Sequence, residues 1–261
     1  MEGAAGPAGG GEREGGESVD PLHQFEIVRY LDVRVEGLDF SFTNSSLWMA
    51  LAVAASYFLI MAGTRQHAMV PGRLQSVVEM LYEFVAGIVR DSAGKEAMRF
   101  FPLIFTLFIF ILIGNMLGMV PGSFTFTSHI IVTFVMASAV FLGVTVLGFV
   151  IHGARFLTFF VPHGAPKAML PLLVPIEILS YCVRPISLSV RLFVNMMAGH
   201  TMMKVFAGFV VSLGSYYVLP GIFPLAIAVA LTGFEIAVAF LQAYIFTVLT
   251  CIYLHDAIHM H

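Results

Sequence analysis

The chain has 261 residues, of which 59% are hydrophobic and 11% are charged, and its formal net charge is −3. A soluble domain carries about twice that share of charged residues, so the composition excludes an ordinary soluble protein. The sequence shows no basic patch that would support nucleic-acid binding. Several apolar runs exceed the ~20 residues that span a bilayer, and they are continuous instead of alternating. We therefore expect an all-α membrane protein.

The N-terminal part differs in composition from the rest. Residues 1–19 are rich in Gly and Glu and have no apolar core, which predicts a disordered tail and not a signal peptide. Residues 20–261 are predicted to form a single membrane domain. Its first segment, up to residue 44, mixes charged and apolar residues, as is typical of chain at a membrane surface.

Apolar runs predict membrane spans at about residues 46–63, 101–120 and 129–151. Residues 71–97 instead carry apolar side chains at helical spacing with charged ones between them, which predicts an amphipathic helix in the membrane interface. In the second span, Asn115 lies within a small-xxx-small pattern that permits close helix approach. We expect Asn115 to join helices and not to bind a transported ion.

The C-terminal half predicts two very long helices, about residues 168–218 and 222–255, in a hairpin that reverses at Pro220-Gly221. Both exceed the length of a perpendicular span, so they should be tilted, partly interfacial or kinked. Pro185 should bend the first of them. The expected total is about five membrane-embedded helices plus one interfacial helix.

Lysine and arginine are concentrated in two connecting segments, residues 64–100 and 152–167. The segments 121–128 and 216–224 contain neither residue. The positive-inside rule therefore places the two basic segments and the C-terminus in the cytoplasm, and the N-terminus outside. The chain shows no internal repeat of the kind common in secondary transporters.

One apolar stretch, residues 175–200, carries a polar stripe. On a helix its polar residues are spaced by three or four and fall within one narrow sector: Glu177, Ser180, Arg184, Ser187, Arg191 and Asn195. An arginine at the centre of a membrane helix costs about 2.5–3.5 kcal/mol on insertion scales. Such a stripe must face protein or water, and it is a candidate functional site.

The two arginines of this stripe call for different interpretations. Arg191 lies deep in the apolar helix, and a guanidinium cannot lose its proton, so it can attract or repel ions but cannot relay a proton. The alternative for Arg191 is a structural role, in which it pairs with a carboxylate such as Glu177. Arg184 lies nearer the cytoplasmic end, one heptad after Glu177, and we expect it to form a structural pair.

A second group of ionisable residues is predicted at the hairpin. Glu235 and Gln242 are seven residues apart and share a helix face. His200 lies nine residues after Arg191, about 180° round the helix, and a hairpin could bring it to Glu235. A His–carboxylate pair can hold and pass protons. The alternatives are an interhelical hydrogen bond for Glu235 and a carbonyl partner for His200.

Conventional catalytic motifs are missing from the sequence. It contains no phosphate loop, nucleophile elbow or dinucleotide fingerprint, so we expect no enzymatic activity of the chain alone and no cofactor. His255, His259 and His261 crowd the C-terminus, but no acidic motif accompanies them, and we expect solvated side chains and no metal site. Cys182 and Cys251 lie in apolar segments and do not suggest a disulfide framework.

Three stretches resemble one protein family. Residues 185–200 (PISLSVRLFVNMMAGH) resemble the signature of subunit a of the F-type ATP synthase, and residues 235–249 and 114–121 resemble its last helix and second span. The resemblance covers about residues 70–255. It implies a stator subunit packed against a rotating ring of subunit c, with the peripheral stalk subunit b, other synthase subunits and membrane lipid as neighbours. The implied location is a cell inner membrane with a periplasmic N-terminus.

The family also implies roles for individual residues. Arg191 would face the proton-carrying carboxylate of the ring and separate two offset half-channels. The half-channel from the outside would be lined by Asn195, His200, Glu235 and Gln242, and the cytoplasmic exit by Glu177 and Ser187. Many bacterial members have glutamate at the position of His200 and histidine at that of Glu235. The exchanged arrangement here is similar to mitochondrial and α-proteobacterial members and suggests an α-proteobacterial source.

Two other functions remain open from the sequence. A stand-alone proton channel or proton-coupled transporter would need its own carboxylate relay, whereas the deep spans contain only Glu177 and Glu235. A structural membrane scaffold would leave Arg191 unexplained. No cluster of hydroxyls and carboxylates suggests sodium, so the proton is the expected coupling ion.

Overall fold

The computed structural model describes residues 29–31, 34–35, 38–39, 42–65, 71–120, 123–161, 169–216 and 218–259. The predicted disordered tail, residues 1–19, lies outside the described residues. Just before the first helix, β1 (Arg29–Leu31) pairs with β4 (Phe42–Thr43) and β2 (Arg34–Val35) pairs with β3 (Leu38–Asp39), both antiparallel. The sequence had predicted no strands here. The pairs are only two or three residues long, and all the other elements of the described chain are helices.

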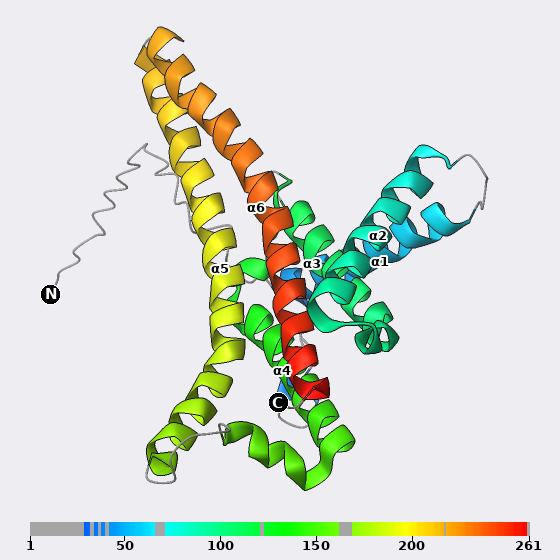
Figure 1. Cartoon of the computed structure of the whole chain (residues 1–261). Helices are drawn as coiled ribbons and strands as arrows, with labels where there is room; N and C mark the ends of the chain where they lie inside the picture. Colours follow the sequence, from blue (N-terminus) through cyan, green and yellow to red (C-terminus); the bar gives the residue numbers. More distant parts are fainter. Residues whose placement is uncertain are drawn as a thin grey trace, which may run out of the picture.

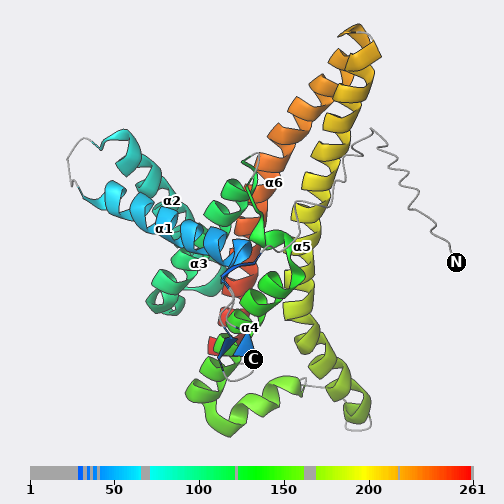
Figure 2. The ribbon, with the colours of Figure 1, turned by 180° about the vertical axis from the view of Figure 1, so that it is seen from behind.

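Helix α1 (Asn44–Thr64) begins where the side chain of Thr43 accepts a hydrogen bond from the Ser46 amide, which satisfies one free N–H of the first turn. Helix α2 (Arg73–Ala93) buries one face only and is not among the helices apolar enough to cross a membrane. This fits the predicted amphipathic helix. Figure 2 shows α1 and α2 side by side, leaning away from the rest of the bundle.

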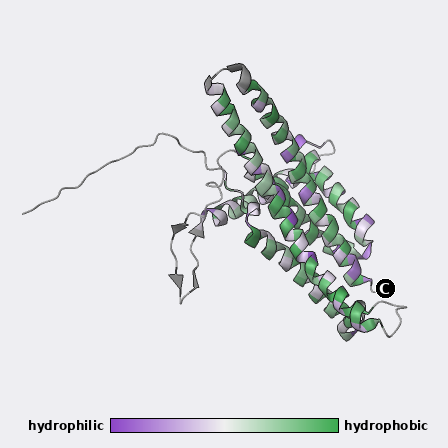
Figure 3. Ribbon diagram, turned by 90° about the vertical axis from the view of Figure 1, so that its left-hand side faces the viewer, coloured by the Kyte–Doolittle hydropathy of each residue, from purple (hydrophilic) through white to green (hydrophobic). Residues whose placement is uncertain are grey.

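The two central helices are α3 (Phe101–Gly118) and α4 (Ile130–His152). Three short 3-10 helices flank them: η2 (Glu96–Phe100), η3 (Phe126–Ser128) and η4 (Gly153–Phe160). Counted over the described residues, five helices are long and apolar enough to cross a membrane, and this confirms the predicted fold class. Figure 3 shows hydrophobic residues along most of the length of the helices, as expected for helices in contact with lipid.

The two C-terminal helices are very long. Helix α5 (Leu170–Tyr216) has 47 residues and α6 (Val218–Ile258) has 41, which correspond to about 70 and 60 Å. They lie side by side next to their connection and diverge towards the other end (Figure 1). Helix α5 stays helical through Pro175 and Pro185 and bends in its lower, olive-green part.

The predicted reversal point was wrong by a few residues. Because α6 begins at Val218, Pro220 and Gly221 belong to its first turn and not to the connection. A proline is tolerated there because the first N–H groups of a helix have no partner within the helix. Gly221 matters for packing instead, since a Cβ at this position would lie 3.0 Å from the Cα of Gly214 in α5.

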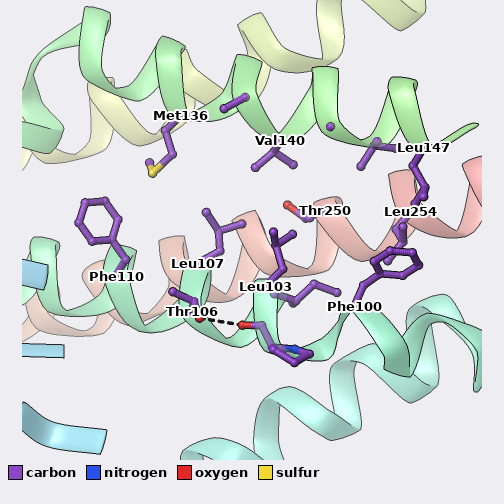
Figure 4. A pocket seen from close by; sticks show the side chains of 15 residues that line it. Phe100, Leu103, Thr106, Leu107, Phe110, Met136, Val140, Leu147, Thr250 and Leu254 are labelled. Atoms are coloured by element: carbon purple, nitrogen blue, oxygen red, sulfur yellow. Dashed lines mark hydrogen bonds between the residues drawn. The ribbon is translucent and has the colours of Figure 1, made fainter. Parts of the chain in front are cut away.

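The main core is formed where α2, α3 and α4 meet α5 and α6. Its largest fully buried side chains include Ile104, Phe108, Leu192, Met196 and Phe246. A cavity of 760 Å³ beside this core is lined by α3, α4 and α6 (Figure 4). Its hydroxyls are already bonded within their own helices, Thr106 to Pro102 O at 2.7 Å and Thr250 to Phe246 O at 2.9 Å. The cavity therefore presents hydrocarbon and is not the candidate site for an ion.

Candidate functional site

A buried histidine–carboxylate pair lies where α5 crosses α6. His200 Nδ1 is 3.6 Å from Glu235 Oε1, and the two side chains are only 7% and 5% exposed. The other ring nitrogen, Nε2, is 3.0 Å from the hydroxyl oxygen of Thr125. The contact between His200 and Glu235 that the hairpin predicted is therefore present. At 3.6 Å the two groups are within ion-pair range but are not hydrogen-bonded, and neither carboxyl oxygen of Glu235 has a hydrogen-bond partner in the described structure. An imidazole and a carboxyl group are side chains that can hold and pass protons near neutral pH.

The position of the Glu235 carboxylate against α5 depends on a glycine. A Cβ at Gly199 would lie 2.7 Å from Glu235 Oε1 and 3.0 Å from its carboxyl carbon. Real Cβ contacts are essentially never this short, so no other residue fits without displacing the carboxylate. The sequence places Gly199 directly before His200, and its missing side chain gives Glu235 the space to reach the imidazole.

A polar loop between α3 and α4 covers the histidine. The hydroxyl of Thr125 donates to Gly118 O at 3.0 Å, and the hydroxyl of Ser128 donates to the carbonyl of Thr125. A Cβ at Gly118 would lie 2.7 Å from the Thr125 side chain, so this position also needs glycine. Sequence reasoning missed Thr125. The available signal was the run of hydroxyl residues between two spans.

Asn195 and Gln242, the other two residues predicted for the half-channel from the outside, lie on the same two helices as His200 and Glu235. Gln242 is 4% exposed and lies about two turns after Glu235 on α6. Asn195 lies on α5 between Arg191 and His200 and is half-buried. Between Glu235 and Gln242, Asn115 Nδ2 donates to Ala239 O at 3.3 Å and joins α3 to α6. This hydrogen bond agrees with the helix-joining role expected for Asn115.

Arg191 is placed differently from every other ionisable residue of the site. Its side chain is exposed on α5, next to the exposed apolar residues Val190 and Val194. Within the described ranges it makes no hydrogen bond or ion pair. The alternative pairing with Glu177 is therefore not found. A cation on an apolar membrane surface is costly unless an anion or water faces it.

Arg184 has the structural role that the sequence predicted, but with another partner. Its Nη1 donates to Asp256 Oδ2 of α6 at 3.1 Å, and its guanidinium lies over the rings of Tyr181 and Tyr253 at 5.3 and 5.1 Å. Glu177, seven residues earlier, is about 10 Å away along the helix axis, too far for an ion pair on a helix. The arginine pairs across the helix interface because Asp256 approaches it there.

The two residues predicted for the exit side lie apart from the buried pair. Glu177 is half-buried and Ser187 is exposed, both on the N-terminal side of Arg191 on α5. From Glu177 to His200 the helix rises by about 35 Å. The structure thus separates the predicted site into two groups along α5, with Arg191 between them.

Two further histidines lie outside the site. The rings of His255 and His259 stack with centroids 4.7 Å apart, and His259 Nε2 is 3.7 Å from Glu96 Oε2. The described part of the chain contains no group of three or more potential metal ligands. His261 is not among the described residues.

The fold and the site define an integral membrane protein whose long helical hairpin carries a buried histidine–carboxylate pair and an exposed arginine. Residues 46–255 match the model of the family described as ATP synthase A chain, and the chain belongs to this family. It is 59% identical over 248 residues to ATP synthase subunit a of Parvibaculum lavamentivorans, covering 94% of this chain and 95% of that one. It is 55% identical to ATP synthase subunit a of Mesorhizobium japonicum over 246 residues, 93% of this chain and 98% of that one.

Proposed function

We propose that this chain is a stator subunit that carries protons to and from the carboxylates of a rotor ring, through two offset half-channels. Membership of the ATP synthase A chain family supports a place in that complex and in the inner membrane. The chain then supplies the proton path, and the chemistry on ATP takes place on other subunits. Its neighbours are the ring of subunit c, the peripheral stalk subunit b and lipid.

The observation that carries this proposal is the exposed, unpaired position of Arg191 in the described structure. A permanent cation on an apolar membrane surface costs several kcal/mol by insertion scales unless an anion or water faces it. A carboxylate on the ring supplies that anion each time a ring subunit passes. Because Arg191 stays protonated, it holds the carboxylate ionised and blocks a direct proton leak between the half-channels.

The entry half-channel leads from the outside to the ring past the buried pair. His200 and Glu235, 3.6 Å apart in the structure, approach to hydrogen-bond distance when they exchange a proton, and Asn195 and Gln242 supply amide groups on the same two helices. The exit half-channel uses Glu177 and Ser187 on the far side of Arg191. The N-terminus is then periplasmic and the C-terminus cytoplasmic, as the basic connecting segments require.

Rotation follows from the cost of charge in lipid. A ring carboxylate that receives a proton at the entry side becomes neutral and can move into the lipid, whereas an ionised one cannot. After nearly a full turn it reaches the exit side and releases the proton. The membrane potential contributes about 2.3 kcal/mol per charge per 100 mV, in addition to the pH gradient.

The test is Arg191→Ala in the assembled complex. ATP-driven proton pumping into inverted membrane vesicles should be abolished, while the amount of complex in the membrane stays the same. Full pumping with normal assembly would overturn the proposal.

A further inference from the structure

The hydroxyl of Thr125 has one hydrogen and two hydrogen-bonding neighbours. Gly118 O is a carbonyl and can only accept; it takes hydrogen bonds from Ser123 Oγ at 2.9 Å and from the Thr125 hydroxyl at 3.0 Å. Towards His200 Nε2, also at 3.0 Å, Thr125 can therefore present only a lone pair. In this arrangement Nε2 of His200 carries the hydrogen and donates it to Thr125.

This arrangement determines the state of the other ring nitrogen. A neutral imidazole carries one proton, so with Nε2 protonated the lone pair is on Nδ1. Nδ1 is the atom that faces Glu235 Oε1 at 3.6 Å. The basic nitrogen of the histidine is thus directed at the carboxyl group. With the opposite tautomer, Nδ1 would already carry a hydrogen and could not take one from Glu235.

We propose that Thr125 is a positioning residue for proton transfer: its hydroxyl fixes the imidazole of His200 with the basic nitrogen directed at Glu235. This inference rests on the proposed function. In the transfer, the O–H bond at Glu235 Oε1 breaks and an N–H bond forms at Nδ1, leaving a carboxylate and an imidazolium. The reverse step returns the proton to Oε1, and the Nε2–H bond stays intact throughout.

The same geometry limits where the proton can go. The chain of hydrogen bonds from Nε2 ends at the carbonyl of Gly118, which has no proton to pass on. His200 therefore accepts a proton from Glu235 through Nδ1 and returns it to Glu235 through the same atom. The onward path to the ring leads through the carboxylate and not through the imidazole.

Thr125 is held for this role by its surroundings. Its side chain is buried, with 5% exposure, and its carbonyl accepts a hydrogen bond from Ser128. The glycine at position 118 leaves space for the hydroxyl to approach the α3 backbone. A threonine that served only to attach the loop to α3 would have no effect on the tautomer of His200, and this difference can be measured.

The chain offers a matched control two residues away. Thr127 is 0% exposed, and its hydroxyl has no hydrogen-bond partner in the described structure. Thr125→Val and Thr127→Val make the same change of shape and polarity in the same loop. Only the first removes an acceptor from His200.

The first experiment measures proton flux through the whole complex in vesicles. Loss of one hydrogen bond predicts a reduction of about five- to tenfold for Thr125→Val. Thr125→Ser, which keeps the hydroxyl, should restore most of the flux, and Thr127→Val should stay within about twofold of the parent. Unchanged flux in Thr125→Val, or equal losses in both valine variants, would overturn the proposal.

The second experiment reads the tautomer directly in the parent complex, so it does not depend on a variant that folds. Nitrogen-15 solid-state NMR of histidine-labelled complex, with the His200 signals assigned by their loss in His200→Gln, should show protonated Nε2 and unprotonated Nδ1. A protonated Nδ1 in the neutral ring would contradict the proposal. If Arg191→Ala pumps normally, the proposed function fails; if only the Thr125 results disagree, this inference alone fails.

Discussion

His200 of α5 and Glu235 of α6 face each other at 3.6 Å in a buried position that neither helix could create alone. The pair stands about nine residues along α5 from Arg191, which is exposed on the helix surface. In the proposed function the His200–Glu235 pair exchanges protons, whereas Arg191 keeps its charge and only repels them. The separation along α5 keeps these two roles apart.

If the pair acts as a unit, exchanging its members should preserve part of its function. The single changes His200→Glu and Glu235→His each leave two like groups facing each other and should lower proton flux strongly. The double change restores one acid and one imidazole and should retain more flux than either single change, with a coupling free energy of about 1–3 kcal/mol. Flux in vesicles measures this, and losses that simply add would show that the residues act independently.

Gly199 should be as sensitive as the pair itself. In Gly199→Ala the new Cβ would meet Glu235 Oε1 at 2.7 Å and displace the carboxylate or part the helices. Displacement of a reacting group by about 1 Å can cost up to a hundredfold in rate, so we expect a loss of flux of at least about tenfold.

The matched control for that change is Gly208→Ala on the same helix, where a Cβ would meet nothing within 4 Å. Proton flux should be unchanged there. Equal effects of the two alanines would mean that helix propensity and not contact with Glu235 explains the result.

Arg184 should contribute to stability and not to pumping. Removing its ion pair with Asp256 in Arg184→Met should cost about 1–2 kcal/mol, because the pair is partly exposed. The thermal midpoint of the complex should fall, while pumping per assembled complex is retained. The charge-reversed double variant Arg184→Asp/Asp256→Arg should recover part of the stability. Loss of pumping in fully assembled Arg184→Met would contradict this assignment.

The loop that carries Thr125 should be weakened by acid. His129, just outside the span that begins at Ile130, stacks on Phe124 with ring centroids 5.0 Å apart, and burial lowers its pKa below the ordinary 6.5. The unfolded loop therefore binds a proton more readily than the folded loop, so its stability is full above pH 6.5 and falls as the pH drops below that value. The hydrogen-exchange protection of residues 123–129, measured relative to the intrinsic exchange rate at each pH, should fall at acidic pH, and His129→Phe should abolish this change in protection. Protection of these residues that stays the same from neutral to acidic pH in the parent would contradict this prediction.

Much of this structure could be predicted from the sequence because membrane helices are local features. Length and apolar periodicity identify the five long helices, and helical phase places His200 on the opposite side from Arg191. The amphipathic pattern likewise distinguishes α2 from the spans. Each of these predictions depends on residues close together in the chain.

The features that were missed depend on contacts between distant segments. Asp256 is 72 residues from Arg184, and Thr125 is 75 residues from His200. No periodicity connects such pairs, so heptad spacing suggested Glu177 as the partner of Arg184. The reversal between α5 and α6 was misplaced for another reason: Pro-Gly is common in turns, but proline is equally suited to the first turn of a helix.

The most direct test of the central claim is a structure of the assembled complex in which the side chain of Arg191 is resolved. The proposed function predicts that Arg191 faces the ring, with its guanidinium within about 4 Å of a ring carboxylate or joined to it by one water. An Arg191 that faces lipid, or that is paired with a carboxylate of another stator subunit, would contradict it.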